Sequence, residues 1–281
     1  MNIFAYVYLL CTMKIVDCFT FFNELDLLKY RLHILNDVVD FFVIVEATHT
    51  HAGKEKTLIF EENKHLFEKY KDKIIHVVVS DFKFVAPDID FQKNEQWKNE
   101  NYQRDCIDKG IQRLKDCLSP DDVLTITDLD EIPDPRILNT IKTQNINITV
   151  NILEMDFYYY NLNSKIQEKW YHPKIISYGT YRNLGLSFNA LRFHECEVIR
   201  RGGWHLSYFG DANFIQTKIK EFAHQELNNE NFTNIEKIKK RMNSHSDLYD
   251  RPYNRVDKIR IQDNDYLPPD YDTFLRKFFT L

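Results

Sequence analysis

Residues 123–133, VLTITDLDEIP, set the architecture of this chain of 281 residues. The run VLTIT is rich in β-branched side chains and is typical of a strand that is buried on both faces of a parallel sheet. It passes directly into Asp128, Leu129, Asp130 and Glu131, and Pro133 then ends the strand. The sequence therefore predicts a central strand whose carboxyl end carries two aspartates one residue apart.

Three apolar runs with the same character precede this strand, at residues 14–22, 41–47 and 74–80. Leucines at helical spacing follow the first run, and helical patterns cover residues 61–70 and 94–118. Strands that alternate with helices predict an α/β fold with a mostly parallel central sheet flanked by helices. Such sheets bind ligands at the carboxyl ends of their strands, which is where the acidic cluster is expected to lie.

The second half of the chain is less regular. A strand is expected at residues 148–160 and a polar helix at residues 213–227. From residue 228 onward the sequence is polar and is interrupted by three prolines, which favours a tail that wraps around the domain. The length fits either one large domain or two small ones and does not choose between them. We take a single core as the default and expect residues 13–281 to form one domain, preceded by an apolar extension at residues 1–12.

Composition and charge exclude several classes of protein. The net charge of −5 arises from well-mixed acids and bases, so the chain has no basic face for nucleic acid. Five scattered cysteines without a CxxC pair indicate free thiols in a reducing compartment. The apolar residues 1–12 are far short of the roughly 20 residues that a membrane span needs. We therefore expect a cytoplasmic protein, or one peripheral to a membrane, ahead of a secreted one, and the oligomeric state stays open.

The spacing of Asp128 and Asp130 suits a divalent cation that is bound together with a diphosphate. Mg²⁺ and Mn²⁺ accept one or two carboxylates plus phosphate oxygens. At a strand end, one carboxylate can reach the cation while the other contacts a bound water or a ribose hydroxyl. A lone D-x-D triplet is also found as a helix cap or as a solvated acidic pair, so the context after a buried strand is what favours the functional interpretation.

The wider sequence resembles glycosyltransferase family 17, whose best-known members add the bisecting N-acetylglucosamine during N-glycan processing. The segments that carry the resemblance are KIVDCFTFFNELDLLKYRLHIL (14–35), VDFFVIVEATHTHAGK (39–54), NYQRDCI (101–107), DDVLTITDLDEIPDP (121–135) and GGWHLSYFG (202–210). The resemblance implies a GT-A fold, a UDP-sugar donor, Mn²⁺ or Mg²⁺, and an inverting transfer to a glycan hydroxyl. It also implies a nucleotide-binding half at residues 13–135 and an acceptor half with the C-terminal tail at residues 136–281.

Several other residues are candidates for the donor site. The late histidine His205 is the candidate third metal or diphosphate ligand beside Asp128 and Asp130, with His224 in reserve. The remaining donor-site candidates lie at strand ends or on the helix at 94–118: Asn23, Glu24 and Glu46 for the nucleotide, Lys54 for a phosphate, and Arg104 for an ion pair with Asp128 or for the diphosphate. Glu24 could equally cap the helix that follows it.

An inverting transfer also needs a general base to accept the proton of the acceptor hydroxyl. Asp211 is the first candidate for this base and Glu154 the second. Two rival functions remain open at this stage. A non-catalytic glycan-binding module would share the fold, and a phosphatase of the haloacid dehalogenase type would also place D-x-D after a strand. Ile132 stands where such phosphatases expect Thr or Val, and the motif follows three earlier strands instead of the first.

Overall fold

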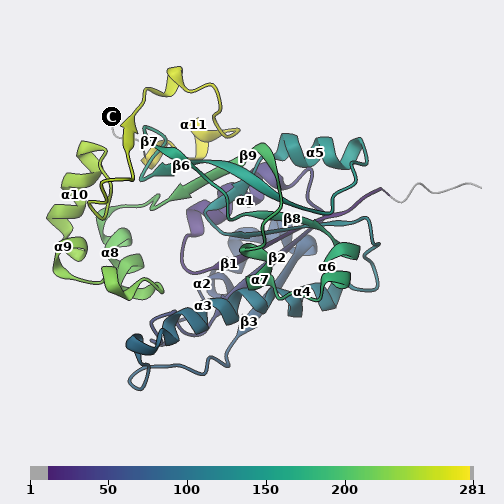
Figure 1. Cartoon of the computed structure of the whole chain (residues 1–281), viewed down its shortest axis with the longest axis horizontal. Coiled ribbons are helices and arrows are strands. Elements are labelled where there is room, and N and C mark those ends of the chain that lie inside the picture. Colours follow the sequence, from purple (N-terminus) through teal and green to yellow (C-terminus); the bar gives the residue numbers. More distant parts are fainter. Residues whose placement is uncertain (1–11, 279–281) are drawn as a thin grey trace, which may run out of the picture.

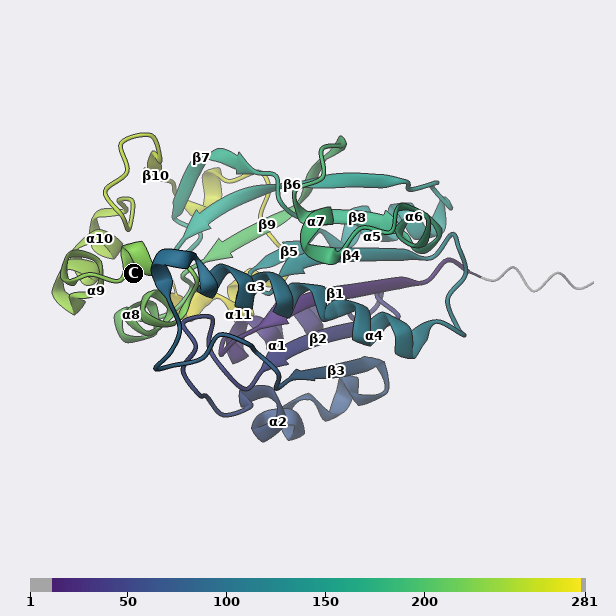
Figure 2. The same cartoon turned by 60° about the horizontal axis from the view of Figure 1, so that its bottom comes forward.

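The computed structural model describes residues 12–278, which form an α/β fold (Figures 1 and 2). The extension predicted at residues 1–12 lies outside the described residues apart from Thr12. Ten strands form one sheet in the order β10-β7-β6-β8-β4-β1-β2-β3, with β9 beside β6 and β5 beside β9. None of the helices within residues 12–278 has the length and apolarity that crossing a membrane requires.

The first half of the chain forms the parallel part of the sheet. Its strands are β1 (Ile15–Phe21), β2 (Phe41–Ala47), β3 (Ile74–Val79) and β4 (Val123–Asp128). β1 pairs in parallel with β2 and with β4, and the register places Thr20 opposite Asp128. All four strands predicted in this half are therefore confirmed, and Asp128 lies at the carboxyl end of β4.

The second half corrects the prediction of a mostly parallel sheet. Its strands are β5 (Glu131–Pro133), β6 (Val150–Tyr159), β7 (Ser164–Trp170), β8 (Lys174–Ser177), β9 (Glu197–Ser207) and β10 (Val256–Lys258). β8 runs antiparallel to both of its neighbours, β4 and β6. The pairs β6 and β7, β5 and β9, and β7 and β10 are antiparallel as well, so the sheet as a whole is mixed. β6 and β9 are the parallel pair of this half. Apolar runs such as KIIS indicate burial without indicating strand direction.

The helices of the first half lie on the two faces of the sheet. They are α1 (Leu25–Leu35), α2 (Ile59–Asn63), η1 (Lys64–Lys73), η2 (Phe91–Lys93), α3 (Glu95–Asp105), α4 (Ile107–Leu114) and α5 (Pro135–Thr143). Figure 2 shows α3 and α4 crossing one face of the strands. The helix predicted at residues 94–118 is thus two helices that meet at Cys106, and the one predicted at 61–70 is a short α-helix followed by a 3-10 helix.

The remaining helices are α6 (Tyr178–Leu184), α7 (Phe188–Arg192), α8 (Ala212–Glu221), η3 (Gln225–Leu227), α9 (Glu230–Thr233), α10 (Ile235–Ser244), η4 (Ile261–Asp263), α11 (Tyr271–Phe274) and η5 (Arg276–Phe278). In Figure 1, α8, α9 and α10 gather at one end of the sheet. They enclose a third apolar cluster that includes Ile215, Ile238 and Tyr249. The residues after 228 therefore carry core side chains as well as wrapping the domain.

Side chains that alternate along β1 enter two different cores. Ile15, Phe19 and Phe21 pack with α1 in one cluster, whereas Val16 and Cys18 pack with α4 in another. This arrangement is the two-sided burial that a continuous apolar strand predicts. Cys18 and Cys106 are buried free thiols, and none of the cysteines within residues 12–278 forms a disulfide.

Candidate active site

A cavity of about 680 Å³ opens at the carboxyl ends of β1 and β4. Thr20 and Phe21 line it from β1, and residues 128–131 line it from the segment after β4. The opposite wall comes from the second half of the chain, and its charged or ionisable side chains include Arg192, His205 and Lys218. The sheet thus places the acidic cluster at the position expected for a ligand site.

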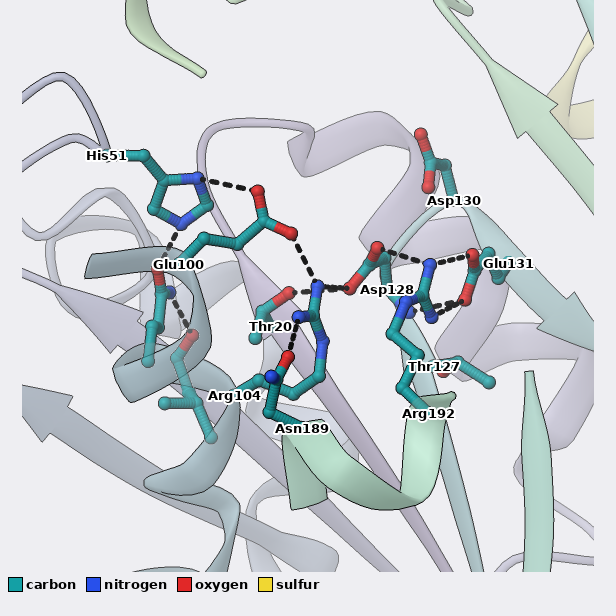
Figure 3. Close-up of polar contacts among 12 residues, drawn as sticks. Thr20, His51, Glu100, Arg104, Thr127, Asp128, Asp130, Glu131, Asn189 and Arg192 are labelled. Carbon is teal, nitrogen blue, oxygen red and sulfur yellow. Dashed lines mark hydrogen bonds and ion pairs between the residues drawn. The ribbon is translucent and has the colours of Figure 1, made fainter. Parts of the chain in front are cut away.

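Asp128 lies between two guanidinium groups (Figure 3). Its Oδ1 is 3.2 Å from Arg104 Nη2 and accepts a hydrogen bond from Thr20, and its Oδ2 is 3.0 Å from Arg192 Nη2. Burial opposes ionisation of this carboxyl, but Arg192 and Arg104 outweigh it and hold the pKa of Asp128 well below its ordinary value. Asp128 is therefore an anion whose two oxygens both hold arginine side chains in place.

Asp130 faces a different set of partners and lies apart from this network in Figure 3. Its Oδ2 is 2.9 Å from Lys218 Nζ, and its Oδ1 is 3.6 Å from His205 Nε2. Burial again opposes ionisation, yet Lys218 and His205 keep the pKa of Asp130 far below its usual range. Lys218 also lies 3.1 Å from Glu24, so two carboxylates share one ammonium group.

Glu131 is a structural acid that the sequence did not single out. Its two oxygens accept hydrogen bonds from both terminal nitrogens of Arg192, at 2.6 and 2.9 Å. They also accept hydrogen bonds from Trp170 Nε1 at 2.5 Å and from the backbone amide of Asp128 at 2.8 Å. With four donors on one buried carboxylate, Glu131 fixes Arg192 and the turn after β4.

Arg31 of α1 is a second buried arginine that supports the same turn. This fully buried side chain forms a two-pronged ion pair with Asp17, with hydrogen bonds of 2.6 and 2.8 Å. Its Nη1 donates to the carbonyl oxygens of Asp128, Leu129 and Glu131 at 2.8 to 3.0 Å. The backbone of the acidic turn is therefore held by an arginine from α1. No short motif in the sequence marks Arg31 or Arg192, because their partners lie about 100 and 60 residues away.

The structure separates the other predicted donor-site residues. Glu24 and Arg104 line the cavity. Glu46 is buried outside it, where it accepts from Phe60 N and His76 at 3.0 Å. Lys54 is also outside the lining and pairs with Glu221 at 2.9 Å. Asn23 lies outside the lining as well, and its buried Oδ1 has no hydrogen-bond partner within residues 12–278.

The two predicted bases and the reserve histidine occupy different surroundings. Asp211 is the N-cap of α8 and accepts a hydrogen bond from the amide of Phe214 at 2.8 Å. Glu154 accepts one from the Tyr171 hydroxyl at 3.1 Å. Neither carboxylate is among the residues that line the cavity. His224 does line it, and its ring lies 4.5 Å from that of Trp97.

Aromatic side chains surround the rest of the cavity. His205 stacks on Phe157 with ring centroids 4.4 Å apart and lies 4.5 Å from the Trp170 ring. At the rim, Tyr171, Phe193 and Tyr253 are 45%, 62% and 72% exposed. Exposed rings beside a polar cavity can stack on the apolar faces of sugars.

Comparisons with known proteins identify the family to which the chain belongs. The family described as Glycosyltransferase family 17 matches residues 3–253. The β-1,4-mannosyl-glycoprotein 4-β-N-acetylglucosaminyltransferases of Rattus norvegicus and Homo sapiens are each 33% identical to this chain over 123 residues. The mouse protein of the same name is 32% identical over 123 residues. Each match spans 43% of this chain and 22% of the relative. Because the family match covers most of the sequence, the chain belongs to glycosyltransferase family 17.

Proposed function

We propose that this protein transfers N-acetylglucosamine from a UDP-sugar to a hydroxyl of a glycan acceptor, with inversion at the anomeric carbon. The observation that carries this proposal is the cavity at the end of β4, where Asp128 and Asp130 lie beside three cationic side chains. The names of the relatives support N-acetylglucosamine as the transferred sugar. The parallel half of the sheet and the position of the site at its strand ends are consistent with a GT-A arrangement.

The cationic groups suit the leaving group of such a reaction. When the bond between sugar and diphosphate breaks, negative charge develops on the phosphate oxygens. Arg104, Arg192 and Lys218 all line the cavity and form ion pairs with carboxylates, so they are oriented before a ligand arrives. Preorganised charges of this kind stabilise a developing anion without a reorganisation cost. We assign the diphosphate to this side of the cavity.

The residues present also fit a divalent cation. Asp130 remains ionised, and the adjacent His205 has a buried Nδ1 without a hydrogen-bond partner within the described residues. Carboxylate and imidazole together suit Mn²⁺. Asp130 and His205 would hold the ion, with Asp128 behind them as the acid that orients the arginines. Within residues 12–278, no three or more His, Cys, Asp or Glu side chains are grouped so that they could hold a metal ion by themselves. Phosphate oxygens and water would therefore complete the coordination. When bound, the cation supplies further charge against the departing diphosphate.

The acceptor is proposed as a class instead of a single glycan. The relatives are named for β-1,4-mannosyl glycoproteins, and the exposed rings of Tyr171, Phe193 and Tyr253 at the rim suit an oligosaccharide. These three residues all come from the second half of the chain, which we propose binds the acceptor. A mannose-containing glycan is therefore the first acceptor to test.

A UDP-release screen over nucleotide sugars, with and without Mn²⁺ or Mg²⁺, tests the proposed function. We expect release from UDP-N-acetylglucosamine that requires metal and is lost in Asp130→Ala. Equal turnover in EDTA would reject the role of the metal. Glycan binding without UDP release from any donor would instead identify a non-catalytic glycan-binding module, and cleavage of simple phosphomonoesters would identify a phosphatase.

A further inference from the structure

The carboxylates that line the cavity differ in whether they form an ion pair with a lysine or arginine side chain. They are Glu24, Glu100, Asp128, Asp130, Glu131, Glu168 and Glu221. Six of the seven are paired. In addition to the acids described above, Glu100 lies 2.9 Å from Arg104 and Glu221 lies 2.9 Å from Lys54. Glu168 alone has neither an ion pair nor a side-chain hydrogen bond with any residue in the range 12–278.

Glu168 lies in a bulge of β7. Met155 of β6 pairs with Trp170, but Phe157 pairs with Ile166, so β7 has two more residues than β6 between these pairs. The intervening residues 167–169 are all exposed and do not alternate in and out. Bulges bend a strand, change the direction of its side chains, and occur often next to active sites. Glu168 therefore lies in this bulge on the wall of the cavity, and its carboxylate has no ion-pair or hydrogen-bond partner within residues 12–278.

The two residues that follow Glu168 connect the bulge to the acidic cluster through side-chain contacts. Lys169 forms an ion pair with the buried Asp156. Trp170 donates its indole hydrogen to Glu131 and packs against the ring of His205. The backbone next to Glu168 is therefore fixed relative to Glu131 and His205, the residues that accompany Asp128 and Asp130.

We propose that Glu168 is the general base of the transfer reaction, an inference that rests on the proposed function. The acceptor hydroxyl oxygen attacks the anomeric carbon and forms the new glycosidic bond. The bond from that carbon to the diphosphate oxygen breaks, and its electron pair leaves with UDP. The hydroxyl proton passes to the Glu168 carboxylate and is later released to water.

Charge explains why the other acids suit this role less well. A carboxylate that already accepts hydrogen bonds from guanidinium or ammonium groups has a lowered affinity for protons. The pKa of Glu100, Asp128 and Asp130 is lowered in this way, with Arg104, Arg192 and Lys218 opposing the effect of burial. A free carboxylate beside the acceptor can take up a proton without first losing a cation.

His172 is the strongest rival for the role of base. Its ring lies 4.7 Å from Trp170 and 5.7 Å from Phe193, and it lines the same cavity. Burial and the nearby Arg192 lower the pKa of His172, so its imidazole is neutral at physiological pH. The aromatic rings that enclose it favour a packing role. Glu168 is preferred because it is exposed to the incoming acceptor.

The test compares Glu168→Gln with the wild-type protein, with UDP-N-acetylglucosamine and a mannose-containing glycan as substrates. Removal of a general base should lower kcat by about 10²- to 10⁴-fold. UDP affinity measured by calorimetry should stay within about twofold, since the diphosphate contacts are untouched. Added formate, a small carboxylate, should restore part of the lost rate in Glu168→Gln, which would not happen if the residue were merely structural.

Three further variants make the result decisive. Glu197→Gln removes an exposed carboxylate of β9 outside the cavity and should leave kcat unchanged. A normal rate in Glu168→Gln, or a large loss confined to His172→Gln or Glu154→Gln, would overturn the assignment. If the wild-type protein released no UDP from any nucleotide sugar, the proposed function itself would fail. An active wild type with an equally active Glu168→Gln would reject only the base.

Discussion

Arg192 contacts both Asp128 and Glu131, and its side chain is only 6% exposed. If its guanidinium is removed, two acids are left without their principal cation in a low-dielectric site. Breaking a buried pair by removing one partner costs about 3–5 kcal/mol, because the remaining charge is uncompensated. The stability of the site therefore depends strongly on a residue that no sequence motif contains.

We predict that Arg192→Met lowers the free energy of unfolding by about 3 kcal/mol or more. The measurement is urea-induced unfolding followed by circular dichroism. Arg200→Met, at an exposed position of β9, is the matched control and should change stability by less than about 0.5 kcal/mol. Similar values for the two variants would contradict the role given to the buried ion pairs.

The lowered pKa of Asp130 also predicts a pH dependence of stability. Because the folded-state pKa lies below the unfolded value of about 3.9, the stabilisation is present at neutral pH and is lost as the pH falls below that value. Unfolding measured between about pH 6 and pH 3 should show wild type losing more stability than Asp130→Asn. A constant difference between the two proteins across this range would contradict the prediction.

Among the structural elements, the turn after β4 depends on α1. Arg31 of α1 donates to three carbonyls of residues 128–131 while it holds Asp17 of β1. A helix from the start of the chain thus fixes the backbone that carries the acidic cluster. These contacts need both the length and the forked shape of arginine, because the two terminal nitrogens of Arg31 together donate five hydrogen bonds.

We predict that Arg31→Lys destabilises the protein and also weakens UDP binding, although it keeps the charge. A single ammonium cannot reach Asp17 and three carbonyls at once, so the cost should be about 3 kcal/mol in unfolding experiments. Lys29→Arg, on the same helix at a half-buried position, is the control and should leave both properties unchanged. Normal UDP affinity in Arg31→Lys would mean that the turn holds its shape without this contact.

The elements also explain what the sequence could predict. The four strands of the first half and the position of Asp128 follow from local patterns, because each apolar run and its polar end are continuous in the sequence. The antiparallel strands β7 and β8 were not predicted, since KIIS is short and residues 164–170 are mostly polar. Glu131 was visible in the sequence, but no role was assigned to it. Arg31, Arg192 and Lys218 were identified only through contacts between distant segments, and Glu168 only through its place on the cavity wall.

Across the whole molecule, the C-terminal residues close the first core. Tyr266 stacks on Trp204 with ring centroids 4.8 Å apart, and its hydroxyl donates to Asp134 at 2.9 Å. Leu275 is fully buried in the same cluster as the strands of the first half. The polar composition after residue 228 gives no signal for these contacts, because Tyr266 and Leu275 are single buried residues in a largely polar segment.

We predict that Tyr266→Ala costs about 3–5 kcal/mol, as expected for removal of a buried aromatic ring. Thermal unfolding should shift downward, and the tryptophan emission should move to longer wavelength as Trp204 meets water. Tyr253→Ala, at a position that is 72% exposed, provides the control and should leave the melting temperature nearly unchanged. Equal melting temperatures for both variants would show that the C-terminal segment contributes little to the first core.

The distance along the chain between Asp130 and its ammonium partner has a consequence during synthesis. Lys218 emerges from the ribosome 88 residues after Asp130, and Tyr249 and Arg251 of the cavity wall emerge later still. A nascent chain that has completed only its first half therefore contains the acidic cluster and Arg104 but neither Arg192 nor Lys218. The proposed diphosphate site is therefore complete only after most of the chain has been synthesised.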